Sequence, residues 1–235
     1  MSRQIDKSSF NLKWDVEAER FYETGVSRGV LYVYDPDATT PGYQEGVVWN
    51  GLTQVQETPS GAEANAQYAD DIKYLNLYSL EELGATVEAF TYPDAFMECD
   101  GSAAVGTGVY VGQQTRKQFA LCYTTRVGAG PDADAGYKIH ILYGCKASPS
   151  ERAYATVNDS PEPITFSWEL TTTPVSVTGY KDTSLVVIDS TKITNGTKLT
   201  ALEQTLYGTP AEGQTAATPA TLLMPDDIIS ALAQG

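Results

Sequence analysis

The chain has 235 residues, 42% of them hydrophobic and 19% charged, which is enough apolar material for a core and argues against a wholly disordered protein. Its 30 acidic and 15 basic residues give a net charge of -15, which excludes a basic groove that wraps nucleic acid, because phosphate binding requires Lys and Arg. The 3 cysteines do not form a disulfide or zinc pattern, and no apolar run has the length of a membrane span or of a signal-peptide core. We therefore expect synthesis in a reducing compartment, without secretion or membrane insertion.

The first part of the chain predicts a terminal arm followed by strands. Residues 1–28 are polar and weakly patterned, which suits an arm that orders only against a partner. Residues 30–34 (VLYVY) predict a strand that ends at Asp35-Pro36-Asp37. The next two strands, 46–49 and 53–57, are expected to form a hairpin across Asn50-Gly51, the dipeptide best suited to a type I′ turn.

More strands and one short helix are predicted up to residue 124. Composition predicts strands at 66–69, 72–78, 85–92, 109–111 and 118–124. Between them, residues 93–100 (PDAFMECD) predict a short helix, with Pro93 at the first helical position and Gly101 as a stop. We expect this helix to flank a sheet.

Residues 136–175 contain the clearest alternation in the sequence. Four apolar residues share one face of a strand, and four polar residues share the other: Ile164, Phe166, Trp168 and Leu170 against Thr165, Ser167, Glu169 and Thr171. Upstream, Tyr137, Ile139, Ile141 and Tyr143 oppose Lys138 and His140 in the same way. Both strands are expected to cover a core on one side and to meet something polar on the other.

The last part of the chain predicts a strand and two helices. Residues 184–189 (SLVVID) predict a short strand, and Leu199, Leu202 and Leu206 recur at helical spacing, with Thr197 as N-cap and Gly208 as stop. Residues 209–225 form a linker rich in Pro, Ala and Thr before a marginal terminal helix. We expect an N-terminal arm (1–28), a β domain (29–190) and a C-terminal segment of helix, linker and helix (191–235).

Few residues in the sequence suggest a catalytic or metal-binding site. Gly25 to Gly29 match the G-x-S-x-G nucleophile elbow, with His140 as the possible base for Ser27, but the elbow must follow a strand and here a strand follows it. Acidic pairs such as Asp70-Asp71 do not continue into a calcium-binding loop. The sequence therefore predicts no catalytic, cofactor-binding or metal-ligating residue.

Five blocks of the sequence resemble the major tail tube protein of long, non-contractile-tailed phages. The blocks are 46–63, 67–79, 91–101, 112–125 and 136–175, and the resemblance runs from about Gly29 to about Ile188. Residues after Lys198 match least well. The resemblance implies an antiparallel β-sandwich or half-barrel with a flanking helix, and a family without catalytic residues.

The resemblance also implies a structural role in the virion. Family members assemble as hexameric rings that stack into the tail tube, and they use terminal arms and a long loop for ring-to-ring contact. The implied partners are further copies of the chain, tape-measure and terminator proteins, and double-stranded DNA that passes through without specific binding. An acidic lumen would repel phosphates, and Thr165, Ser167, Glu169 and Asp189 are candidate lumen-facing residues.

Two other functions remain open on the sequence. One is a β-sandwich binding module of a virion, in which some of the 15 tyrosines hold a carbohydrate or a host-surface protein. The other is a hydrolase built on Ser27 and His140. We expect the tube subunit, made in the host cytoplasm and located in the phage tail.

Overall fold

The computed structural model describes residues 20–156, 163–212 and 216–233. Most of the expected N-terminal arm, residues 1–19, lies outside the described residues. The strands are β1 (Phe21–Asp35), β2 (Gly42–Tyr43), β3 (Val47–Trp49), β4 (Leu52–Gly61), β5 (Ala64–Ala69), β6 (Ile72–Tyr78), β7 (Glu81–Ala89), β8 (Ala103–Gly106), β9 (Val109–Val111), β10 (Phe119–Ala129), β11 (Asp132–Ala147), β12 (Phe166–Thr172) and β13 (Leu185–Asp189). The helices are the 3-10 helix η3 (Asp94–Glu98) and the α-helices α1 (Gly196–Tyr207) and α2 (Pro225–Ala233). The expectation of a mainly β chain is confirmed.

A 9-stranded antiparallel sheet organises the molecule, in the order β2-β1-β10-β11-β12-β7-β4, with β13 on β11 and β3 on β1. One edge of β11 pairs first with β13, through Lys138 to Leu142, and then with β12, through Cys145 to Ala147. Gly144 lies between these segments with a φ of 61°, and a Cβ there would lie 2.1 Å from the carbonyl oxygen of Thr173. Only glycine fits this irregular point, which lets one strand join the two halves of the sheet.

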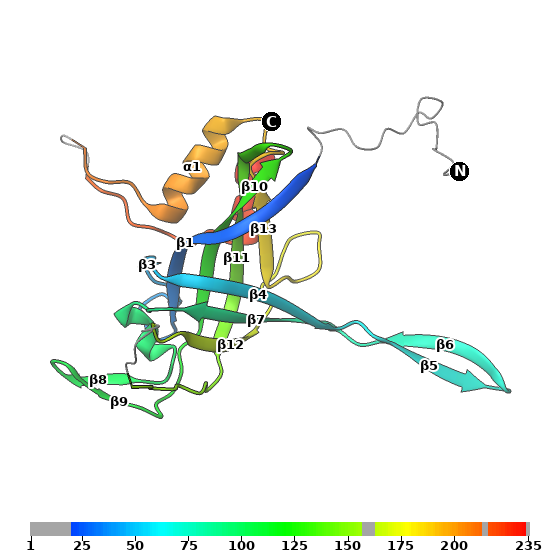
Figure 1. The fold of residues 1–235 in the computed structure, drawn as a ribbon. Helices are drawn as coiled ribbons and strands as arrows, with labels where there is room; N and C mark the ends of the chain where they lie inside the picture. Colours follow the sequence, from blue (N-terminus) through cyan, green and yellow to red (C-terminus); the bar gives the residue numbers. More distant parts are fainter. Residues whose placement is uncertain (1–19, 157–162, 213–215, 234–235) are drawn as a thin grey trace, which may run out of the picture.

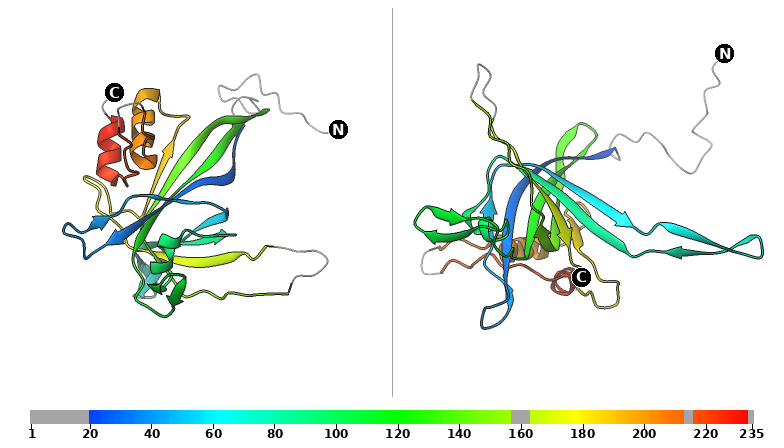
Figure 2. Two further views of the ribbon diagram at one scale, coloured as in Figure 1. Left: turned by 90° about the vertical axis from the view of Figure 1, so that its left-hand side faces the viewer. Right: turned by 90° about the horizontal axis from the view of Figure 1, so that it is seen from below.

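The two halves of the sheet and the helices form three layers (Figures 1 and 2). Strands β4, β7 and β12 cross one face of β1, β10, β11 and β13, while α1 and α2 cover the other face. The first core lies between the sheet halves and includes Leu121, Trp168 and the η3 residue Phe96. The second core lies under the helices and includes Ile141 and Leu202. Each large apolar side chain buried here contributes about 1.5–3 kcal/mol of transfer free energy.

The alternation in β12 is confirmed over the strand that forms. Trp168 and Leu170 are 1% exposed, and Phe166 packs against the first core. Ile164, which was expected to share this face, precedes β12 and is 39% exposed. Leu199, Leu202 and Leu206 are buried on one side of α1, as their spacing predicts, and Gly208 ends the helix with a φ of 74°.

Several local expectations are wrong. Residues 46–49 and 53–57 do not form a hairpin across Asn50-Gly51, because β3 pairs with β1 and β4 pairs with β7. The helix at 93–100 is a shorter 3-10 helix, with Pro93 at its N-cap, that places Phe96 in the core. Asn195, not Thr197, caps α1, accepting from the backbone N–H of Lys198 at 3.3 Å.

The expectation that one side of β11 meets polar surroundings is also wrong for the middle of the strand. His140 is only 9% exposed, because the β4–β7–β12 layer covers the side of β11 that the alternation assigned to polar surroundings. Strand β1 begins at Phe21, so residues 21–28 pair with β10 and do not belong to a free arm. The three cysteines are free and buried, and burial raises the pKa of the Cys99 and Cys122 thiols to about 12.

Candidate functional site

The outward side of β4, β7 and β12 forms a polar surface built from directly paired residues. Three rows cross the strands, and together they define the outer polar face: Gln54, Glu88 and Ser167; Gln56, Thr86 and Glu169; Thr58, Gly84 and Thr171. The rows contain two carboxylates and no cation, and Lys146 of β11 pairs with Thr171 at the margin. Period-two alternation places these side chains outward because the residues between them fill the first core.

The structure brings only part of the expected lumen-facing set to this face. Ser167 and Glu169 lie on it, and Thr165 is exposed just before β12 begins. Asp189 lies elsewhere, at the end of β13, where it pairs with Lys138 in the other half of the sheet. Gln54, Gln56, Thr86 and Glu88 were missed by sequence reasoning. The alternation of these residues with Val55, Ala85, Val87 and Ala89 was the signal that predicts them.

A partly buried polar cluster ties β4 to the central strands. The Tyr123 hydroxyl donates to Oε1 of Glu57 at 2.5 Å, and Nδ1 of His140 lies 3.2 Å from the same oxygen. Nε2 of His140 lies 3.1 Å from the Thr125 hydroxyl, and the His140 and Tyr123 rings stack with centroids 4.8 Å apart. The hydrogen bond from His140 lowers the pKa of the Glu57 carboxyl, with a smaller contribution from Tyr123, while burial opposes the shift. With its proton on Nδ1, the imidazole satisfies both neighbours, so the cluster acts as a structural tie.

Ser27 lies outside this cluster. The Ser27 hydroxyl donates to the carbonyl of Thr124 at 3.4 Å, whereas both His140 nitrogens contact Glu57 and Thr125. Gly25 to Gly29 lie inside strand β1, so the turn between strand and helix that an elbow requires does not form there. This geometry gives the Ser27 hydroxyl no contact with a base.

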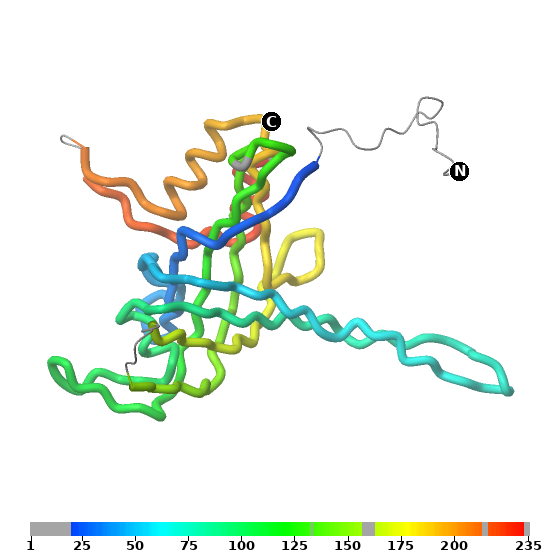
Figure 3. The backbone as a smooth tube through the Cα atoms, viewed as in Figure 1, coloured from blue at the N-terminus to red at the C-terminus, as the bar shows by residue number. Residues whose placement is uncertain are grey.

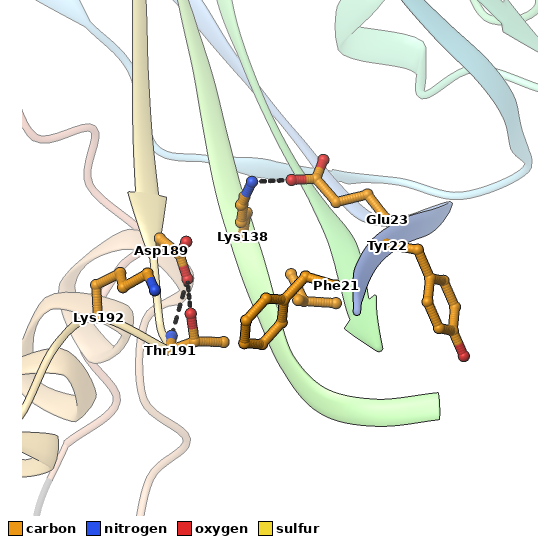
Figure 4. A pocket seen from close by; sticks show the side chains of 8 residues that line it. Phe21, Tyr22, Glu23, Lys138, Asp189, Thr191 and Lys192 are labelled. Atoms are coloured by element: carbon orange, nitrogen blue, oxygen red, sulfur yellow. Dashed lines mark hydrogen bonds and ion pairs between the residues drawn. The ribbon is translucent and has the colours of Figure 1, made fainter. Parts of the chain in front are cut away.

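A pocket of about 310 Å³ opens where β1 begins and β13 ends (Figure 4). Lys138 forms an ion pair with Glu23, and Asp189 accepts from the backbone N–H and the hydroxyl of Thr191 at 2.9 and 2.6 Å. The ammonium of Lys192 lies 5.4 Å from the centre of the Phe21 ring. Each charged group of the pocket thus has a partner within it, which suits a surface recess more than a reactive centre.

Two ribbons leave the body of the molecule (Figures 1 and 3). The β5–β6 ribbon extends the β4–β7 hairpin and turns at Asp70-Asp71, where both residues have positive φ. The β8–β9 ribbon projects on the other side of the molecule. Both ribbons expose large apolar side chains, among them Tyr74 at 68% and Val109 at 55%. Two-stranded ribbons of this kind are marginally stable alone in water, so these surfaces are suited to contact with another molecule.

Within 20–156, 163–212 and 216–233, no three ligating side chains come together as a metal site. In that part of the chain, no helix combines the length and apolar character needed to cross a bilayer.

No family model matches the chain, and comparison with curated proteins finds no match.

Proposed function

We propose that the chain is the structural subunit of a phage tail tube of the long, non-contractile type. Copies join into rings, hexameric by the resemblance, and the rings stack into a conduit that delivers the genome to the host cell. The observation that carries the proposal is the β5–β6 ribbon, an exposed apolar extension of the kind expected of a ring-to-ring contact. Residues 67–78 of this ribbon fall in the block 67–79 that resembles the family.

The ends of the sheet support joining of copies side by side. Strand β4 ends the pairing order and β13 pairs with β11, so among the described strands each has an edge of backbone groups without a strand partner. Such edges invite pairing with another chain, and rotational symmetry converts one repeated contact into a closed ring. Exposed edges would make a monomer prone to aggregate, whereas edge-to-edge joining would use the same edges as the assembly interface.

The outer polar face supports a conduit. Glu88 and Glu169 place negative charge there and the three rows contain no cation, so phosphates passing this face would be repelled and not bound. We place Thr165, Ser167 and Glu169 in the lumen lining together with Gln54, Gln56 and Thr86. Asp189 is not included, because it lies on another surface. Tape-measure and terminator proteins would be the other partners, and the virion tail would be the location.

Electron microscopy of concentrated protein tests the assembly. Rings or tubes are the expected result, and particles that stay monomeric across protein and salt concentrations would overturn the proposal. A charge-reversal pair tests the lining: Glu88→Lys with Glu169→Lys should give tubes that retain double-stranded DNA at low salt. Asp37→Lys with Glu212→Lys, at exposed positions outside the rows, is the matched control and should behave as wild type.

The pocket of Figure 4 favours a second candidate, a binding module at the host surface. Phe21 is 55% exposed and its ring lies beside Lys192, and Tyr22, which also lines the pocket, is 42% exposed, a combination that suits a sugar or a peptide. A glycan and host-envelope binding screen tests this reading. Binding lost in Phe21→Ala but kept in the tube-lining variant would favour it over the tube, and no binding would dispose of it.

A further inference from the structure

The β8–β9 ribbon carries apolar residues that the described chain leaves substantially exposed. Val105, Val109, Tyr110 and Val111 are 63%, 55%, 48% and 39% exposed. The strands are short, pairing from Ala103 opposite Val111 to Gly106 opposite Val109, with a register shift between. A ribbon this short gains little from its own backbone pairing, so contact with another surface would stabilise it.

The β5–β6 ribbon also exposes apolar side chains, and it does so on both of its faces. Pairing of Ala64 with Tyr78 and of Ala66 with Asn76 places Ile72, Tyr74 and Tyr78 on one face. Leu75 and Leu77 lie on the other face. All five of these apolar side chains are between 40% and 68% exposed. The two ribbons point away from each other across the body of the molecule, so they cannot meet within one chain (Figures 1 and 2).

Charge distinguishes the two ribbons. The β5–β6 ribbon and its base carry Glu63, Asp70, Asp71, Glu81 and Glu82 against Lys73. The segment from Gly101 to Thr115, which includes β8 and β9, contains no charged residue, and the cations that follow it, Arg116 and Lys117, are paired with Asp100 and Glu98. Copies with a net charge of -15 repel one another over most of their surface. An acidic ribbon meets the least repulsion on the segment that lacks carboxylates.

We propose that the β8–β9 ribbon of one subunit receives the β5–β6 ribbon of a second copy of this chain. The contact joins different surfaces of the two copies, so it repeats from subunit to subunit and generates a ring or a continuing stack. This proposal rests on the proposed tube function, and it adds which surface of a subunit receives the β5–β6 ribbon. The apolar faces supply the contact area, and the carboxylate-free segment sets the direction in which the copies join.

Charge substitutions test the contact in the full chain. Val109→Glu places a carboxylate on the receiving ribbon, and we expect it to raise the protein concentration needed for assembly by about tenfold or more. Adding Asp70→Lys and Asp71→Lys should restore assembly, because the two ribbons then carry opposite charges. Tyr180→Glu, at a side chain 76% exposed in the loop before β13, is the control and should assemble as wild type. Equal assembly of Val109→Glu and Tyr180→Glu overturns the contact.

Cross-linking gives a second readout that does not require tubes. The native thiols are buried, so cysteines added by Tyr74→Cys in one preparation and Tyr110→Cys in another provide the accessible thiols. In a mixture, a short bifunctional maleimide should link the two variants at least about tenfold faster than it links Tyr110→Cys with Tyr180→Cys. Linking without rings in the microscope supports the contact and overturns the tube. Rings with no linking above the control overturn the contact and leave the tube.

Discussion

Glu57 is a single residue that connects the base of the long ribbon to the middle of the sheet. Its Oε1 receives the hydroxyl of Tyr123 and faces Nδ1 of His140, while its side chain is 28% exposed. We predict that Glu57→Gln lowers the free energy of unfolding at pH 7 by about 1–2 kcal/mol, because a charged acceptor is replaced by a neutral one. Urea denaturation measures the change, and Glu169→Gln on the outer polar face is the control.

The pH dependence of this effect has a definite sign. The folded protein holds the pKa of Glu57 below its ordinary value of 4.5, so the folded state favours the ionised carboxylate. Its stabilising contribution is complete above that ordinary value and is lost as the pH falls through the lower folded pKa. The gap between wild type and Glu57→Gln should therefore shrink as the pH is lowered below 4.5. A gap that stays constant over this range would contradict the assigned role of Glu57.

Two buried tyrosines attach the helical layer to the sheet. Tyr32 donates to the carbonyl of Leu206 at 2.5 Å, and Tyr143 donates to the carbonyl of Leu223 at 2.7 Å. Tyr143→Phe should cost about 1–3 kcal/mol of unfolding free energy, because it leaves a carbonyl group without its donor. Tyr180→Phe, at an exposed ring, serves as control in the same thermal or urea denaturation. Equal stability of the two variants would contradict the prediction.

At the scale of elements, the β5–β6 ribbon is separable from the fold. Replacing residues 62–80 by Asn-Gly closes the hairpin at the Gly61–Glu81 pair with a two-residue turn. Because the removed side chains are mostly exposed, unfolding free energy should change by less than about 1 kcal/mol, while assembly should be lost. Urea denaturation and sedimentation measure the two results.

A milder variant controls for the change at the ribbon. Asn-Gly in place of Asp70-Asp71 alone keeps both strands and suits a turn in which both residues have positive φ. This variant should assemble. If the shortened chain forms tubes at the wild-type concentration, the ribbon has no part in joining copies.

Local patterns predicted the elements that depend on local physics. The Leu199, Leu202 and Leu206 spacing located α1, and alternation located the buried face of β12, since each element presents one face to a core. The hairpin over Asn50-Gly51 failed because a turn dipeptide fixes a turn but not the partners of the strands beside it. The surroundings of His140 depend on Glu57 of β4, which is 83 residues away in the chain. A local sequence pattern cannot reveal a contact between residues that far apart.

The candidate site was predictable only in part, for the same reason. Glu169 and Ser167 alternate with buried neighbours and were found. Asp189 was misplaced with them because its position at the end of a short apolar strand does not reveal which half of the sheet that strand joins. The alternation around Glu88 can be seen in the sequence, but the position of Glu88 beside Ser167 depends on the pairing of β7 with β12.

At the scale of the whole molecule, the net charge of -15 opposes the approach of copies. We predict that raising salt from about 10 mM to about 100 mM speeds polymerisation, because the Debye length falls from about 30 Å to about 10 Å. Light scattering measures the rate, with sucrose at matched osmolality as the control for non-ionic effects. Assembly that weakens steadily over this range would contradict the electrostatic account.

The two cores divide the three thiols between them. Cys122 lies in the core beneath the helices, whereas Cys99 and Cys145 lie in the core between the sheet halves. Central strands β10 and β11 belong to both, but each core has its own cover, so either cover can open while the other stays closed. Exposure of Cys122 alone therefore marks opening of the helical layer, and exposure of the other pair marks separation of the sheet halves. The chain carries internal reporters of the order in which its layers come apart.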